Sequence, residues 1–138
     1  MAAKKSMTIA SEALENWLQQ VFEAHDLSSS DALTAAHALV KANLRGVDSH
    51  GVARLARYLN GLRDRLMVAC PESKILAETP TTVTLDAAAG LGQPISHRAM
   101  KMAMEKAKQY GCGCASVTNS NHYGIAGYYA MMALAEDM

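Results

Sequence analysis

The sequence has 138 residues, of which half are hydrophobic and 19% are charged, with 13 Lys and Arg balancing 13 Asp and Glu. This composition excludes a disordered or fibrous chain, and the length suits one domain of ordinary size or part of a larger enzyme. A net charge of zero argues against general nucleic-acid binding and against a basic membrane-surface anchor, so we expect a small or local partner.

Helical periodicity dominates the first half of the chain. A first helix is predicted to begin near Ser11, where apolar residues recur at the spacings of one helix face. Ser28 and Asp31 have the spacing of a capping box, which predicts a second helix from Ser28 up to Gly46. The first helix is expected to bury Leu14, Trp17, Leu18, Val21 and Phe22, and the second to carry Leu33, His37, Val40 and Leu44 on one side.

A third helix is predicted after Gly46, with Asp48 or Ser49 as its N-cap. Its apolar residues alternate at spacings of three and four, which is typical of one buried helix face. This regular stripe is expected to be buried and comprises Val52, Leu55, Leu59, Leu62 and Leu66.

After residue 70 the pattern changes to short runs that are partly β-branched, with turn residues between them. Gly-Leu-Gly-Gln at 90–93 indicates a turn before a helix, and Gly111 is a typical residue at which that helix ends. The predicted elements are strands at 74–77 and 81–85, a helix from Pro94 to about Tyr110, a strand at 112–117, and a helix from 124 to the end.

The order of three helices followed by β-β-α-β-α predicts an α/β (α+β) fold. We expect two parts: residues 1–70 as an N-terminal helical portion and residues 71–138 as the beginning of an α/β domain.

The cysteines and the apolar runs indicate the cellular compartment in which we expect the protein. No apolar run follows Met1–Lys5 and the stretch 125–135 falls short of the roughly 20 residues that span a bilayer, so we expect neither a secretory signal nor a membrane helix. Three cysteines are too few for a disulfide framework and favour a reducing cytoplasm. Cys112 and Cys114 lack a second pair for zinc, and we interpret them as small apolar residues on one strand face, with no metal site.

His50, Arg54 and Tyr58 form the first candidate site. At spacings of four and eight they share one face of the predicted third helix, separate from the leucine stripe. A histidine exchanges protons near neutral pH, an arginine binds a carboxylate through its planar fork, and a tyrosine can bond a second oxygen. These are the groups that a 2-hydroxy or 2-oxo acid requires, although the spacing alone also fits a polar helix surface.

The second candidate site is Ser120-Asn121-His122-Tyr123-Gly124, between a predicted strand and a predicted helix. Loops that follow strands often bind ligands in α/β proteins, and helix N-terminal amides favour anions. The pentapeptide also fits a helix N-cap with an incidental histidine. The Gly90-Leu-Gly92 turn is a weak nucleotide motif, because the third glycine of the pattern is replaced by Ile95.

Three ordered motifs resemble the N-terminal part of the NAD(P)-dependent malate/L-lactate dehydrogenase family. They are the run from Arg45 to Tyr58, the turn Leu91-Gly-Gln93, and the run from Asn119 to Tyr129. This family includes ureidoglycolate, sulfolactate and diketogulonate enzymes and is distinct from the Rossmann lactate and malate dehydrogenases. The 72 residues between His50 and His122 match the family spacing.

The resemblance implies a non-Rossmann dehydrogenase fold and assigns roles to particular residues. The proton-transferring histidine of the DSHG motif falls on His50, and substrate binding falls on Ser49, Arg54 and Tyr58. His122 falls beside substrate and nicotinamide, and either histidine can be the acid/base. The implied cofactor is NAD or NADP, the implied substrate is a small anionic 2-hydroxy or 2-oxo acid, and the implied assembly is a homodimer.

The family resemblance also implies that much of the cofactor site lies beyond Met138, so we expect a truncated member. A helix face of Tyr128, Tyr129, Met132 and Ala133 is expected to stay uncovered, which would make the chain dimeric or aggregation-prone and a weak binder of NAD(H) and NADP(H). The alternative is a non-catalytic helical module that binds a partner protein through its basic helices.

Overall fold

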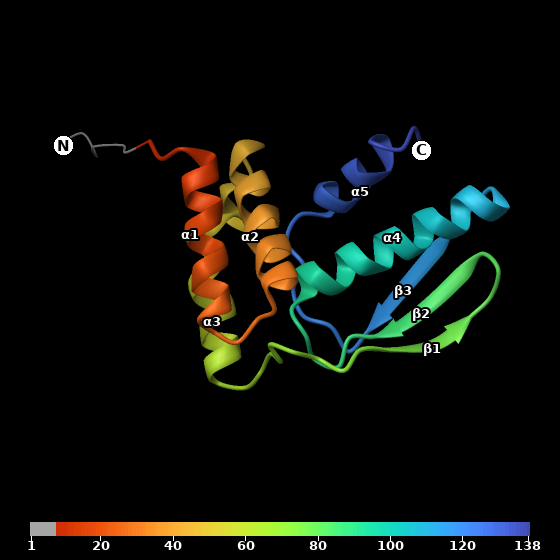
Figure 1. Ribbon diagram of the computed structural model, residues 1–138, viewed down its shortest axis with the longest axis horizontal. Coiled ribbons are helices and arrows are strands. Elements are labelled where there is room, and N and C mark those ends of the chain that lie inside the picture. The colour runs from red at the N-terminus through yellow and green to blue at the C-terminus, as the bar shows by residue number, and fades with distance from the viewer. Residues whose placement is uncertain (1–7) are drawn as a thin grey trace.

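The computed structural model describes residues 8–138, so the expectation of no secretory signal, which depends on Met1–Lys5, lies outside the described residues. The helical first half stands beside a sheet that α4 crosses on one face (Figure 1). The elements are α1 (Ser11–Glu23), α2 (Ser29–Leu44), two 3₁₀ turns η1 (Asp48–His50) and η2 (Val52–Arg54), α3 (Leu55–Arg63), β1 (Lys74–Glu78), β2 (Thr82–Asp86), α4 (Gly92–Tyr110), β3 (Cys114–Thr118) and α5 (Ala126–Leu134). The predicted α/β class and the order of elements are confirmed.

The helical part is built on close contact between α1 and α2. Ser28 caps α2 as predicted, because its hydroxyl accepts a hydrogen bond from the Asp31 N–H at 3.2 Å. Leu18 and Phe22 of α1 are fully buried against α2. The face of α2 that enters the core is rich in small residues, which lets the two helices approach closely, and includes Ala32, Ala35, Ala36 and Leu39.

Four residues predicted to lie on buried or shared stripes are exposed instead. Trp17 lies at the edge of the α1 stripe and is 51% exposed, since the contact with α2 runs along Leu14, Leu18 and Phe22. The alanine-rich face of α2, with Leu39, faces the core, which turns Leu33 and Leu44 outward. The exposed leucines are Leu33, Leu44 and, beyond the end of α3, Leu66. Other members of the third stripe pack, partly buried, against this core: Val52, Leu55, Leu59 and Leu62.

The sheet has the order β1-β2-β3, with β1 antiparallel to β2 and β2 parallel to β3. The helix α4 makes the connection between the parallel strands and covers the sheet with Ile95 and Ala99, which pack on Val83 and Leu85 of β2. Gly111 ends α4 in the left-handed conformation with φ 83°, as predicted. This arrangement places the loop after β3 beside the N-terminus of α4.

Two predictions for the second half are corrected. Cys112 lies outside β3, and both Cys112 and Cys114 are exposed, so they are not paired apolar residues on a strand. Tyr128 and Tyr129 are buried rather than uncovered, because α5 packs them against Ala38 of α2. Among residues 8–138 we find no helix long and apolar enough to span a membrane.

Candidate active site

The segment that carries Ser49 and His50 differs from the predicted continuous helix. The α-helix begins only at Leu55, and two 3₁₀ turns precede it. The cause is Asn43 at the end of α2, whose side-chain oxygen accepts a hydrogen bond from the Val52 N–H at 2.8 Å while its amide donates to the Asp48 carboxylate at 2.5 Å. The prediction that one helix face carries the site is therefore wrong, since a helix that begins at Leu55 includes only Tyr58 of the three residues.

Within the 3₁₀ segment, Ser49 contacts two other candidate residues, His50 and Arg54. Its hydroxyl lies 2.9 Å from His50 Nδ1, and its carbonyl oxygen accepts a hydrogen bond from Arg54 Nε at 2.6 Å. This bond holds one edge of the Arg54 guanidinium. Its two terminal nitrogens have no hydrogen-bond partner within residues 8–138 and can bind an anion.

The loop that carries His122 is anchored to the start of α4. The Asn121 amide donates hydrogen bonds to the carbonyl oxygens of Ala89 at 2.8 Å and Gly90 at 3.1 Å. The backbone of Asn121 and His122 passes so close to Gly92 that a Cβ there would lie 2.4 Å from the Asn121 carbonyl oxygen. Glycine at position 92 is what allows the loop to reach the helical half of the molecule.

His122 meets the two earlier candidates in space. Its ring stacks on the ring of His50, with 5.3 Å between centroids and 26° between planes. Its Nδ1 lies 2.7 Å from the buried Tyr58 hydroxyl. The two imidazoles, 72 residues apart in the sequence, thus lie on one side of the molecule, and Ser49, His50, His122 and Tyr58 form a continuous chain of contacts.

The charges around His122 favour its neutral form. Burial lowers the pKa of the His122 imidazole below its usual value, and His50, Arg57 and Arg54 lower it further. Burial raises the pKa of the Tyr58 hydroxyl. At neutral pH the pair is therefore an uncharged imidazole and an uncharged phenol, which can accept and relay a proton.

Sequence reasoning missed two residues of this site. Asn43 shapes the segment that carries His50, and Gln93 is a fully buried side chain in the first turn of α4. Neither falls on an apolar stripe or in a catalytic pattern, and Gln93 entered only as part of a turn and a family motif. A polar residue next to a glycine that opens a helix was the one available signal for Gln93.

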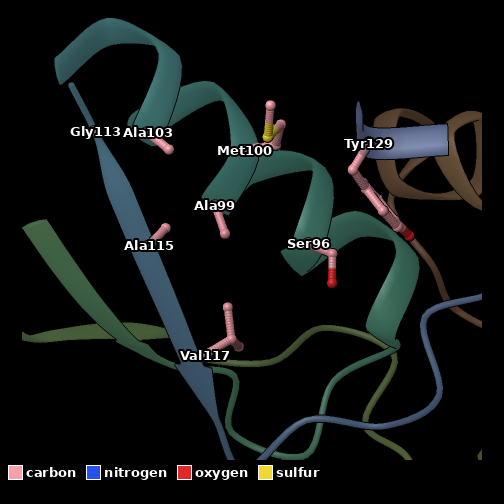
Figure 2. Close-up of a pocket in the computed structure, with 8 residues that line it drawn as sticks. All are labelled: Ser96, Ala99, Met100, Ala103, Gly113, Ala115, Val117 and Tyr129. Carbon is pink, nitrogen blue, oxygen red and sulfur yellow. The ribbon is translucent and has the colours of Figure 1, made fainter. Parts of the chain in front are cut away.

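An apolar cavity lies elsewhere, between α4, β3 and α5. It has a volume of about 320 Å³, and its lining holds no acidic, basic or imidazole group (Figure 2). The lining residues are Ser96, Ala99, Met100, Ala103, Gly113, Ala115, Val117 and Tyr129. It therefore lacks a proton carrier, whereas the histidine pair has two. No cluster of potential metal ligands occurs within residues 8–138.

A family model and two curated relatives of this sequence belong to one group of dehydrogenases. Residues 9–138 match the family model described as malate/L-lactate dehydrogenase. The malate dehydrogenase of Pyrococcus abyssi is 43% identical over 130 residues, which are 94% of this chain and 36% of that protein. The L-sulfolactate dehydrogenase of Methanocaldococcus jannaschii is 36% identical, over 96% of this chain and 38% of that protein.

Solved structures give the same result. The malate dehydrogenase of Pyrococcus horikoshii OT3 superposes with a TM-score of 0.94 and 41% identity, over 96% of this chain and 38% of that one. The sulfolactate dehydrogenase of Methanocaldococcus jannaschii superposes with a TM-score of 0.93 and 36% identity, over the same shares. The chain thus spans little more than a third of the length of the relatives it matches.

Proposed function

Because the chain belongs to the malate/L-lactate dehydrogenase family, we propose that it contributes the proton-exchange site of an enzyme that transfers hydride between a nicotinamide cofactor and a small 2-hydroxy or 2-oxo acid. The observation that carries the proposal is the stacking of His50 on His122. Malate and sulfolactate, named in the relatives, are hydroxy acids with more than one acidic group.

Arg54 is the proposed anchor for the substrate carboxylate. Its terminal nitrogens are available while Nε is held by the Ser49 carbonyl, so the fork is oriented before substrate binds. Arg57 adds positive charge close enough to lower the pKa of His122. Ser49 and Tyr58 are proposed to complete the binding of substrate oxygens.

One of the two histidines is proposed to exchange the proton of the substrate hydroxyl. The neutral imidazole of His122 can take this proton when the alcohol is oxidised and return it when the carbonyl is reduced. Tyr58, bonded to Nδ1, leaves Nε2 as the nitrogen that exchanges the proton with substrate. His50, stacked on the same ring, is the second candidate for this role.

The nicotinamide ring, as NAD or NADP, would supply the hydride acceptor or donor. The described residues fit the half of the reaction that moves a proton, and we place His122 beside the ring. They do not fit the nucleotide phosphates at the glycine turn, because a Cβ at Gly90 would lie 2.5 Å from the Pro71 ring and Gly92 is in contact with Asn121. These glycines serve chain packing.

Two further proposals concern organisation. Residues 8–70, the described part of the first unit, are proposed to belong to a helical portion and residues 71–138 to the beginning of an α/β domain, and the enzyme is proposed to act as a homodimer. Exposed leucines on the described surface support association, with Leu44, Leu66 and Leu134 each more than 60% exposed.

The test is oxidation of NADH and NADPH in the presence of a panel of 2-oxo acids. We expect turnover with oxaloacetate or a sulfonated analogue by a protein that joins this chain to the remaining length of its relatives. Light scattering on the same sample measures the dimer. The absence of turnover with every acid and both cofactors would contradict the proposal and favour a non-catalytic module that binds a partner protein.

A further inference from the structure

The side chain of Gln93 poses a problem that the proposed function leaves unsolved. It is 0% exposed, and neither its Nε2 nor its Oε1 has a hydrogen-bond partner of standard geometry within residues 8–138. A buried amide without partners is costly, and such groups often have a functional reason. The candidates for that reason are the groups that lie next to it.

Gln93 lies next to the buried end of the candidate site. It follows Gly92, on whose Cα the backbone of Asn121 and His122 rests. Its amide lies close enough to the Tyr58 hydroxyl to lower the pKa of that hydroxyl, against the larger effect of burial, although the two groups make no hydrogen bond of standard geometry. The same hydroxyl lies 2.7 Å from His122 Nδ1, so Tyr58 stands between Gln93 and His122.

The chemistry of Gln93, Tyr58 and His122 depends on which group donates in the hydrogen bond between Tyr58 and His122. A neutral imidazole carries its proton on Nδ1 or on Nε2, and a hydroxyl can donate only one hydrogen bond. If Tyr58 donates to Nδ1, the Nε2 of His122 holds the proton, and the tyrosine oxygen needs a donor on its other side. If Nδ1 carries the proton and donates to Tyr58, the tyrosine hydroxyl needs an acceptor there.

A primary amide is a neutral side chain that can meet both needs, because it carries an NH₂ donor and a carbonyl acceptor on one group. An amide rotated by half a turn exchanges the two. We propose that Gln93 is a positioning residue which, through Tyr58, keeps both tautomers of His122 accessible, so that Nε2 can either give or take a proton. The proposal deepens the proposed function, on which its catalytic meaning rests.

Imidazole ¹⁵N chemical shifts of His122 test the proposal, measured on the chain without substrate or cofactor and at a pH where His122 is neutral. In Gln93→Met the tyrosine hydroxyl has only Nδ1 as an acceptor, so the ratio of the Nε2–H to the Nδ1–H form should rise about fivefold, the ratio that one net hydrogen bond produces. In Gln93→Glu, measured at a pH high enough to ionise the buried carboxyl, the carboxylate only accepts, so the ratio should fall.

Two controls separate this effect from a structural one. Gln109→Met changes an exposed glutamine of the same helix and should leave the tautomer ratio unchanged. In a Tyr58→Phe background, Gln93→Met should have no further effect, because the connecting hydroxyl is gone. Circular dichroism shows whether each variant is folded. If Gln93→Met does not fold, Gln93→Glu, which keeps the side-chain shape, replaces it as the test.

An unchanged ratio in a folded Gln93→Met or in Gln93→Glu with its carboxyl ionised would overturn the proposal, as would an equal change in the Tyr58→Phe background. Because no turnover is measured, this result is independent of the dehydrogenase assay. An inactive protein with the predicted tautomer shifts would contradict only the proposed function, and an active protein without them would contradict only the role of Gln93.

Discussion

The state of one imidazole, His122, depends on residues from three separate parts of the chain. Tyr58 of α3 bonds its Nδ1, His50 of the 3₁₀ segment stacks on its ring, and the loop anchored by Asn121 sets its position. Burial and the nearby positive charges keep it neutral near pH 7. Substitutions at single residues should therefore separate proton exchange from substrate binding.

Enzyme kinetics should separate the proposed proton exchange from substrate binding, measured on the protein that joins this chain to the remaining length of its relatives. Arg54→Ala should mainly raise KM, by about 10- to 100-fold, because it removes a charged hydrogen-bond donor for the carboxylate. His50→Ala or His122→Ala should mainly lower kcat, by about 10²- to 10⁴-fold for whichever histidine exchanges the proton. Steady-state assays with varied 2-oxo acid measure both parameters.

Arg63→Ala is the matched control for the arginine, since Arg63 is an exposed residue of α3 paired with Asp64 and should keep both parameters. Full activity in all three site variants would contradict the assigned roles and favour the interaction module.

Gly92 supports the same site through its contact with the backbone of Asn121 and His122. Gly92→Ala should destabilise the fold by about 1–3 kcal/mol, because the new Cβ would meet backbone atoms of Asn121 and His122 that cannot rotate away. Gly127→Ala in α5, where the new Cβ would meet nothing within 4 Å, should leave stability unchanged or raise it by up to about 1 kcal/mol, because alanine favours the helix. Urea denaturation compares the two, and equal stability of both variants would show that the loop does not rest on position 92.

At the scale of elements, the end of α2 determines the shape of the segment that follows it. Asn43 binds both Asp48 and Val52, and these bonds fall across the two 3₁₀ turns that precede α3. In a regular helix that began at Asp48, the Val52 N–H would donate to the Asp48 carbonyl oxygen. Here it donates to the side chain of Asn43, so a bond to a neighbouring element replaces the local helical bond.

Removal of that side chain should loosen the segment. Asn43→Ala should cost about 1–3 kcal/mol of unfolding free energy, since it leaves the Val52 N–H without its partner, and should weaken the nuclear Overhauser contacts between the rings of His50 and His122. Asn60→Ala, at an exposed position of α3, is the control and should change neither. Persistence of the ring contacts in a destabilised Asn43→Ala would show that α4 and the loop alone hold the stack.

At the scale of the whole molecule, stability should depend on three histidines. Burial is the largest cause that lowers the pKa values of His37, His97 and His122 below their usual value near 6.5. In the unfolded chain these groups protonate near pH 6.5, and in the folded chain only at lower pH. Between the two values the unfolded state binds more protons, so acid favours unfolding.

The unfolding free energy should therefore be level above about pH 7 and fall as the pH decreases below about 6.5. His37→Gln removes one of the three groups and should make the fall shallower while it keeps a polar partner for the Tyr128 hydroxyl, which lies 3.0 Å from His37 Nδ1. His25→Gln, a substitution of a histidine other than these three, is the control. Urea denaturation between pH 5 and pH 8 measures the curves, and stability that rises toward pH 5 would refute this account.

Local signals in the sequence predicted the order of the elements and the residue types of the candidate site. Helix caps, turn glycines and periodicity are local signals, so Ser28, Gly111 and the β-branched runs predicted their elements within a few residues. Family motifs identified both His50 and His122 as candidates.

Features that depend on contacts between distant residues could not be predicted and emerge only in the folded molecule. The alanine-rich face of α2 is the buried one because alanines let α1 approach closely. Periodicity alone does not show whether this face or the leucine face is buried. The helix predicted from Asp48 was replaced by 3₁₀ turns because a side chain from α2 takes one of its hydrogen bonds. The bond between Tyr58 and His122 joins residues 64 positions apart, and the burial of Gln93 beside it arises only when α3, α4 and the loop after β3 meet. Such contacts have no local pattern, since their energy exists only in the assembled fold.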